Sequence, residues 1–257
     1  MKKMSTAILS TCVAALLATA GVAPSFAHDR GEDDDRNRGQ EKTVTLTAKP
    51  RPLNSSGVRG SATAVVRNQL IRSIKVHATG LTPDGPHAQQ IHYGDDARNE
   101  CPTMADDTNK DGFLNTVEGQ PAYGPIVVSL TTRGDTTPAS ALAVNRLPVA
   151  VDGELDYRRR NIEFTDVSGT GYTGGTGTAK QIADSIREGE GAVVIHGIDY
   201  NKDGMYNGDR PSELDPSLPA EATDPPPVVS LRRSTTTTET TTMTTATTTG
   251  STRTTDP

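Results

Sequence analysis

A twelve-residue acidic segment, 107–118, carries oxygen-bearing side chains at alternate positions. Six residues would supply oxygen ligands, and they are Asp107, Asn109, Asp111, Phe113 through its carbonyl, Asn115 and Glu118. Gly112 permits a sharp turn in the middle, and Glu118 can offer two oxygens at position twelve. Ca²⁺ takes about six to eight oxygen ligands in such a shell. The spacing therefore predicts a calcium site, the alternative being an Asx-rich turn that binds nothing.

A second segment, beginning at Asp199, repeats the first half of this pattern with the same Asn-Lys-Asp-Gly tetrad. Its position twelve is Arg210, which cannot be a ligand, so the shell could close only if the loop ran differently. The candidate ligands are Asp199, Asn201, Asp203, Met205 through its carbonyl, and Asp209, with Glu213 or Asp215 as other residues that could close the shell. The second segment is therefore either a calcium site or a simple Asx turn.

The flanks of the first loop differ from those of an EF-hand sensor. Cys101-Pro102 precedes it, and Gly119-Gln120-Pro121 should end any helix soon after Glu118. Long paired helices are therefore not expected, and the loop is typical of an isolated EF-hand-like site. Without helices that can swing open, we expect the ion to stabilise the fold rather than to drive a switch.

His92 and His196 are candidate ligands for a transition metal. Strand alternation places Gln90 on the same side as His92 and His87 on the opposite side. His196 follows an apolar run that is typical of an inner strand. A pair at two strand ends could bind a metal such as copper, although a hydrogen-bonded framework is the commoner role of such residues.

Short β-branched runs separated by turn residues must position these groups. The expected strands are Thr43–Ala48, Ser61–Arg67, Leu70–Thr79, Ala88–His92, Pro125–Thr132, Leu142–Val151 and Gly191–Ile198. This spacing predicts an all-β sandwich or barrel with long loops. We further expect a hairpin turn at Arg67-Asn68-Gln69, an exposed His77, a flexible glycine-rich loop over 169–177 and one short helix, Ala179–Glu188.

The two ends of the chain have compositions unlike the body. Residues 1–27 have the basic start, apolar run and small residues of a secretory signal, so we expect a secreted protein with no membrane span after cleavage. A charged linker, 28–42, and a Pro/Thr-rich tail, 216–257, are both expected to be disordered. The folded body is then 43–215.

The chain's 257 residues hold 26 Lys and Arg against 32 Asp and Glu, a formal net charge of −6. This balance argues against a nucleic-acid partner, and two cysteines cannot make a disulfide scaffold. Residues 95–118 hold seven acids and two bases, a net of −5, and residues 199–215 hold five acids and two bases, a net of −3. The acidity is thus concentrated in the two loop segments, which favours a cation as partner.

The chain also carries short motifs of a known family pattern. They are Gly80-Leu81-Thr82-Pro83, His87, His92, Gly94-Asp95, Cys101 and Val193-Val194-Ile195-His196. Over about 55–215 they look like the copper/zinc superoxide dismutase pattern, and they resemble more closely the chordin-type (CHRD) domains of secreted bacterial proteins. The resemblance implies an antiparallel Greek-key sandwich or barrel.

In that pattern His92 and His196 fall on copper ligands, and Gln90 falls where a further copper histidine stands. His87 falls on a structural histidine of the family, whereas the zinc subloop has no counterpart. A dismutase site uses six histidines and an aspartate, and the chain's five histidines argue against that activity.

No P-loop, G-x-S-x-G or H-E-x-x-H motif is present either. The sequence therefore predicts a secreted, non-catalytic, calcium-binding protein that could contact an extracellular or cell-surface protein or polysaccharide in adhesion or matrix. The alternative is a degenerate dismutase-like copper protein.

Overall fold

The computed structural model describes residues 43–49 and 51–234, and its strands pair antiparallel in three sheets. The predicted signal, the predicted linker and the chain after 234 lie outside the described residues. One five-stranded sheet has the order β12 (Arg232–Arg233), β1 (Thr43–Ala48), β3 (Arg59–Arg67), β4 (Leu70–Thr79) and β7 (Glu154–Glu163). The other has the order β2 (Arg51–Pro52), β11 (Pro227–Ser230), β10 (Ala192–Ile195), β5 (Gln89–His92) and β6 (Ile126–Ser129).

The remaining elements are short. Two-residue strands β8 (Val167–Ser168) and β9 (Thr176–Gly177) pair with each other. The α-helices are α1 (Thr116–Tyr123), α2 (Ala179–Glu188) and α3 (Ala220–Thr223). Single 3₁₀ turns are η2 (Met104–Asp106), η3 (Pro138–Ser140), η4 (Val144–Arg146) and η5 (Tyr172–Gly174). None of the helices within the described ranges is long and apolar enough to cross a membrane.

The two large sheets share one apolar core. Side chains of alternate residues on β3 and β4, such as Ala64 and Ile74, are buried there. They pack in the same cluster as Ile91, Val193 and Val229 from the second sheet. This arrangement confirms the all-β prediction, and it gives two sheets packed face to face.

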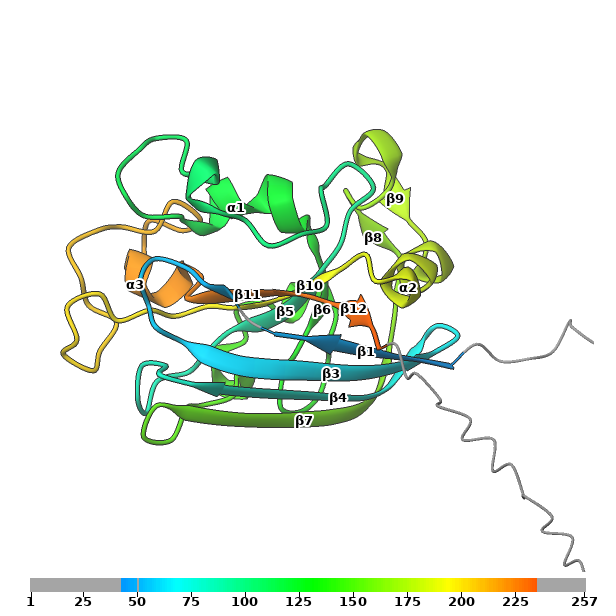
Figure 1. Cartoon of the computed structure of the whole chain (residues 1–257), viewed down its shortest axis with the longest axis horizontal. Coiled ribbons are helices and arrows are strands. Elements are labelled where there is room, and N and C mark those ends of the chain that lie inside the picture. Colours follow the sequence, from blue (N-terminus) through cyan, green and yellow to red (C-terminus); the bar gives the residue numbers. More distant parts are fainter. Residues whose placement is uncertain (1–42, 50, 235–257) are drawn as a thin grey trace, which may run out of the picture. The chain divides into compact units, whose positions relative to one another are not determined.

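The second sheet is covered on its outer face as well. In Figure 1, α1 lies on the side of β10, β5 and β11 that faces away from β3, β4 and β7. Val194 and Val228 point to that side and pack against Leu114 and Tyr123. Because β10 is buried on both faces and lies third in its sheet, the prediction of an inner strand before His196 is confirmed.

Several predicted elements are present with the same bounds. The strands Thr43–Ala48 and Leu70–Thr79 match in full. Asn68 adopts a positive φ of 52° in the tight turn between β3 and β4, as the hairpin prediction requires. The helix Ala179–Glu188 begins at a capping box formed by Thr178 and Gln181.

The predicted strand Leu142–Val151 is wrong. This stretch contains η4 and no strand, and its β-pairing is limited to isolated bridges at Val149 and Val151, both of which are exposed. The true neighbour of β4 is β7, where Leu155, Tyr157 and Ile162 are buried. β7 was missed because its charged residues hide the alternation.

Two further expectations need correction. The glycine-rich stretch 169–177 is not merely a loop, because β8 and β9 pair across it. The predicted tail boundary at 215 is also wrong, since β11 pairs with both β10 and β2, and β12 pairs with β1. Val229 and Leu231 are buried in the core. Pro227 does not interrupt this sheet because it is the first residue of its strand.

Candidate functional site

The predicted loop 107–118 folds around the side chain of Asp107. Oδ2 of Asp107 accepts a hydrogen bond from the backbone N–H of Gly112 at 3.0 Å. Asn109 and Asp111 each accept from the backbone N–H two residues further on, at 2.9 and 2.8 Å. Oδ1 of Asp107 is buried and has no hydrogen-bond partner among the described residues. The loop therefore holds a carboxylate oxygen that lacks a hydrogen-bond donor.

Glu118 closes the loop from the first turn of α1. Its Oε1 accepts from the backbone N–H groups of Thr108 and Asn109 at 2.8 and 3.1 Å, and its Oε2 accepts from the side chain of Asn115 at 2.8 Å. Asn115 in turn caps α1 by accepting from the backbone N–H of Glu118 at 3.0 Å. The segment thus ends with its twelfth residue turned back toward its second and third residues.

α1 continues further than the sequence predicts. Pro121 lies inside the helix, which ends only at Tyr123. A proline here removes one hydrogen bond, the one that its nitrogen would have donated to Val117. Burial of Ala122 and Tyr123 compensates, and the Tyr123 hydroxyl donates to the Thr116 carbonyl at 2.6 Å.

The second loop has the same local geometry as the first. Asp199 accepts through Oδ2 from the backbone N–H of Gly204 at 2.7 Å, as Asp107 does from Gly112. Asn201 and Asp203 each accept from the backbone N–H two residues on, both at 2.9 Å. The residue at position four is in the left-handed region in both loops, with φ of 60° and 61°. The repeated tetrad therefore produces a repeated structure.

The carboxylate that closes the second loop is Glu221, in α3. Its Oε1 accepts from the backbone N–H of Tyr200 at 3.0 Å, and its Oε2 accepts from those of Asn207 and Gly208, both at 2.9 Å. It is buried, with 3% of its surface exposed, whereas the predicted ligand Asp209 is exposed. The sequence carries no spacing signal for Glu221, because it lies eleven positions beyond Arg210, where a continuous loop would close.

The two loops contact each other. The rings of Phe113 and Tyr200 meet edge to face with centroids 4.8 Å apart, and the Arg210 guanidinium lies 4.1 Å from the centre of the Phe113 ring. Asn109 of the first loop donates to Glu213 of the second segment at 3.1 Å. Both loops lie beside α3 in Figure 1. One face of the protein thus presents both acidic loops together.

Asp224 lies behind this contact. The Tyr200 hydroxyl donates to its Oδ2 at 2.9 Å, and Arg210 lies 3.6 Å away. Burial nevertheless raises the pKa of Asp224 to about 6. A buried carboxyl of raised pKa near two acidic loops adds a group that titrates above the usual range of aspartate.

His92 and His196 line one pocket of about 610 Å³ on the outer side of the second sheet. Their ring centroids are 6.5 Å apart. Nδ1 of His92 hydrogen-bonds to the Gly124 carbonyl at 2.7 Å, and Nδ1 of His196 to the Thr223 carbonyl at 2.6 Å. The structure therefore brings the two predicted residues together, each tied to a backbone carbonyl. Copper binding by this pair stays a prediction.

His87 does not join that pair at the pocket. Its Nδ1 lies 2.8 Å from the His196 carbonyl and its Nε2 lies 3.0 Å from the Thr82 carbonyl. Burial lowers its pKa. His87 links the segment before β5 to the end of β10.

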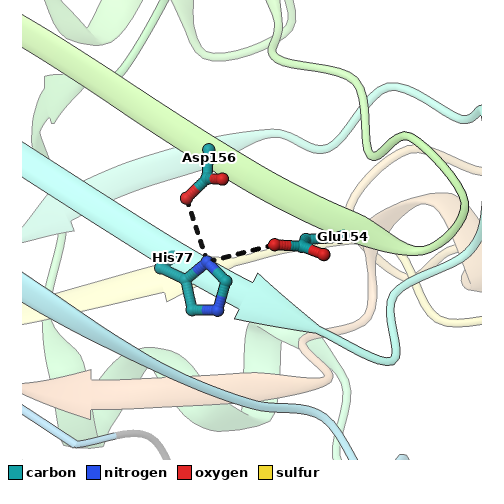
Figure 2. Close-up of side chains that lie close together, drawn as sticks. All are labelled: His77, Glu154 and Asp156. Carbon is teal, nitrogen blue, oxygen red and sulfur yellow. Dashed lines mark hydrogen bonds and ion pairs between the residues drawn. The ribbon is translucent and has the colours of Figure 1, made fainter.

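A third histidine cluster was not predicted. His77 on β4 lies 2.9 Å from Asp156 and 3.8 Å from Glu154 on β7 (Figure 2). Across residues 43–49 and 51–234, this is the one group of three His, Cys, Asp or Glu whose ligand atoms lie within 4.8 Å of one another. Figure 2 shows both carboxylates facing the same ring nitrogen, and both are exposed. The cluster went unrecognised because β7 itself was missed.

No family model matches the chain, and no curated protein matches it.

Proposed function

We propose that this chain is a secreted, non-catalytic, calcium-binding protein of CHRD-like type with a dismutase-like Greek-key sandwich. In this proposal the ion rigidifies the acidic face and supports an extracellular adhesion or matrix contact. The observation that carries it is the buried Oδ1 of Asp107, which lies in a loop with calcium-ligand spacing and receives no hydrogen bond from the part of the chain that the structure describes. A carboxylate oxygen without a donor is costly unless a cation or water satisfies it.

The arrangement of backbone groups supports calcium over a bare turn. The amide hydrogen bonds to Asp107, Asn109 and Asp111 hold one oxygen of each side chain and so fix the orientation of the side chain. Little conformational entropy then remains to be lost when an ion binds. Without an ion, the like charges of the segment repel one another.

The second loop is proposed as a second calcium site with a changed ligand set. Asp199, Asn201, Asp203 and the Met205 carbonyl keep their places, and Glu221 replaces Asp209 as the closing carboxylate. The support is the correspondence between Glu221 and Glu118, since each accepts from the amides at positions two and nine of its loop. Because Glu221 would supply the closing carboxylate from outside the continuous segment, position twelve need not be a ligand and can be an arginine.

Thermal melting of the folded chain with and without a chelator tests the calcium proposal. A ligand at one hundred times its dissociation constant stabilises by about 2.7 kcal/mol per site, which is roughly 5–10 °C for a domain of this size. We expect calcium to raise the melting temperature of the parent, and Glu118→Gln to lose about half of that rise. The exposed Glu163→Gln should keep all of it. No calcium-dependent shift in the parent would overturn the proposal.

A further inference from the structure

The pocket beside His92 and His196 has a floor of hydrogen-bond acceptors. A carbonyl oxygen can only accept, so Nδ1 of each ring carries the proton and donates to Gly124 or Thr223. Burial lowers the pKa of His92 to about 3 and that of His196 to about 4, so both rings are neutral at pH 7. The second nitrogen, Nε2, of each ring then carries a lone pair.

Two acceptors at this pocket have no donor within residues 43–49 and 51–234. Nε2 of His92 and Oε1 of Gln90 are buried without a hydrogen-bond partner among the described residues, and the two side chains are 3% and 2% exposed. The hydrogen bonds described for the ring of His196 involve its Nδ1. Two buried acceptors without a partner in the described chain therefore line the same pocket as the His196 ring. A native structure keeps unsatisfied buried acceptors mainly where water or a ligand supplies the donor.

Much of the remaining lining is apolar, with Asp215 as its one carboxylate among the described residues. Ala88, Ile126 and Val167 contribute to its lining, and Leu142 and Leu214 lie on it while 49% and 50% exposed. Exposed leucines beside a concave surface favour an apolar occupant over water alone. The volume of about 610 Å³ suits a small organic molecule.

A metal ion fits this set of groups less well than an organic molecule that donates a hydrogen bond. Neither histidine belongs to a trio of His, Cys or carboxylate ligands in the described parts of the chain. Zinc and copper sites usually have at least three protein ligands. The apolar part of the lining offers no ligand to a bare ion.

We propose that this pocket binds an uncharged organic molecule with an apolar body and a hydroxyl or N–H donor that points at His92, His196 and Gln90. The site is separate from the calcium loops, and the proposal does not depend on calcium. The donor would satisfy an acceptor that the fold leaves open, and the body would cover the exposed leucines.

The test uses 2-naphthol and its methyl ether, 2-methoxynaphthalene, as probes that differ only in the donor. Binding to the folded parent is followed by ligand-detected NMR and calorimetry. We expect 2-naphthol to bind at least fivefold more tightly than the ether, since the ether leaves the acceptors unpaired. Equal affinity, or no binding of either probe, would overturn the proposal.

Three variants locate the binding. His92→Phe keeps a ring and removes the acceptor, so it should abolish the preference for the hydroxyl. Leu142→Asp changes only an exposed side chain on the pocket and should weaken binding at least fivefold even if His92→Phe does not fold. Val144→Asp, an exposed apolar residue outside the lining, should bind as the parent does. Metal analysis of untagged protein completes the test, because one copper or zinc per chain that is lost in His92→Phe would show a metal site instead.

Discussion

Glu221→Gln is the substitution that separates the proposed second calcium site from an ordinary turn. The side chain is buried and accepts three backbone hydrogen bonds, from Tyr200, Asn207 and Gly208. Glutamine has nearly the same shape, but only one of its two terminal atoms can accept. The other terminal atom becomes an NH₂ group that faces a backbone N–H, so at least one donor loses its partner.

The size of the effect follows from those contacts. A hydrogen bond to a charged group contributes about 1.5–3 kcal/mol, and an orphaned buried donor costs about 1–3 kcal/mol, so we expect a loss of roughly 2–4 kcal/mol without calcium. For a domain of this size the melting temperature should fall by about 5–12 °C. Adding calcium should then recover only the contribution of the first loop, because the closing carboxylate of the second is gone.

Asp209→Asn is the matched control. Asp209 lies in the same loop and was the residue that spacing suggested, but it is exposed and does not close onto the loop amides. We expect its melting temperature and calcium response to equal those of the parent in parallel thermal melts. The reasoning is refuted if Glu221→Gln keeps the full calcium-dependent rise, or if Asp209→Asn loses half of it.

Two other predictions concern stability. His92 and His196 have folded pKa values of about 3 and about 4, below the ordinary 6.5, so the unfolded chain binds more protons and stability is lost as pH falls below 6.5. Each of these two histidines lowers the free energy of unfolding by about 2 kcal/mol at pH 5. Asp224, whose pKa is raised to about 6, offsets about 1 kcal/mol of this loss. Urea unfolding in the presence of chelator should therefore show that the free energy of unfolding falls by roughly 2–3 kcal/mol between pH 7 and pH 5. An unchanged unfolding midpoint would contradict this. A chain that stops after residue 215 loses β11 and β12 and should show no cooperative melt, whereas one that stops after residue 234 should melt as the full chain does; cooperative melting of the shorter chain would contradict the revised boundary.

Much of the β-structure could be predicted because local patterns and tertiary packing agree there. β4 alternates apolar and polar residues between clear turn signals, and β10 is apolar on both faces because α1 covers it from outside. The pattern failed where apolar residues are exposed. Val149 and Val151 resemble a strand in sequence but lie on the surface. Arg159 interrupts the alternation of apolar and polar residues in β7. Its guanidinium donates a hydrogen bond to the Thr131 carbonyl at 2.6 Å.

The candidate site was predictable to the extent that it is local. The six positions of the first loop are continuous in sequence, and the structure turns Glu118 back onto the loop amides as the spacing suggests. Glu221 lies against the second loop because α3 packs there, and the calcium-loop pattern does not include a ligand so far along the sequence. The convergence of His92 and His196 likewise depends on the pairing of β5 with β10. The sequence therefore identifies the chemical groups, but it does not identify the carboxylate that closes the second loop.

The most direct test of the central claim is the calcium stoichiometry of the folded chain, measured by equilibrium dialysis and metal analysis. The proposed function predicts two calcium ions per chain for the parent, with one remaining in Glu118→Gln and one in Glu221→Gln. No bound calcium in the parent, or unchanged stoichiometry in both variants, would contradict it.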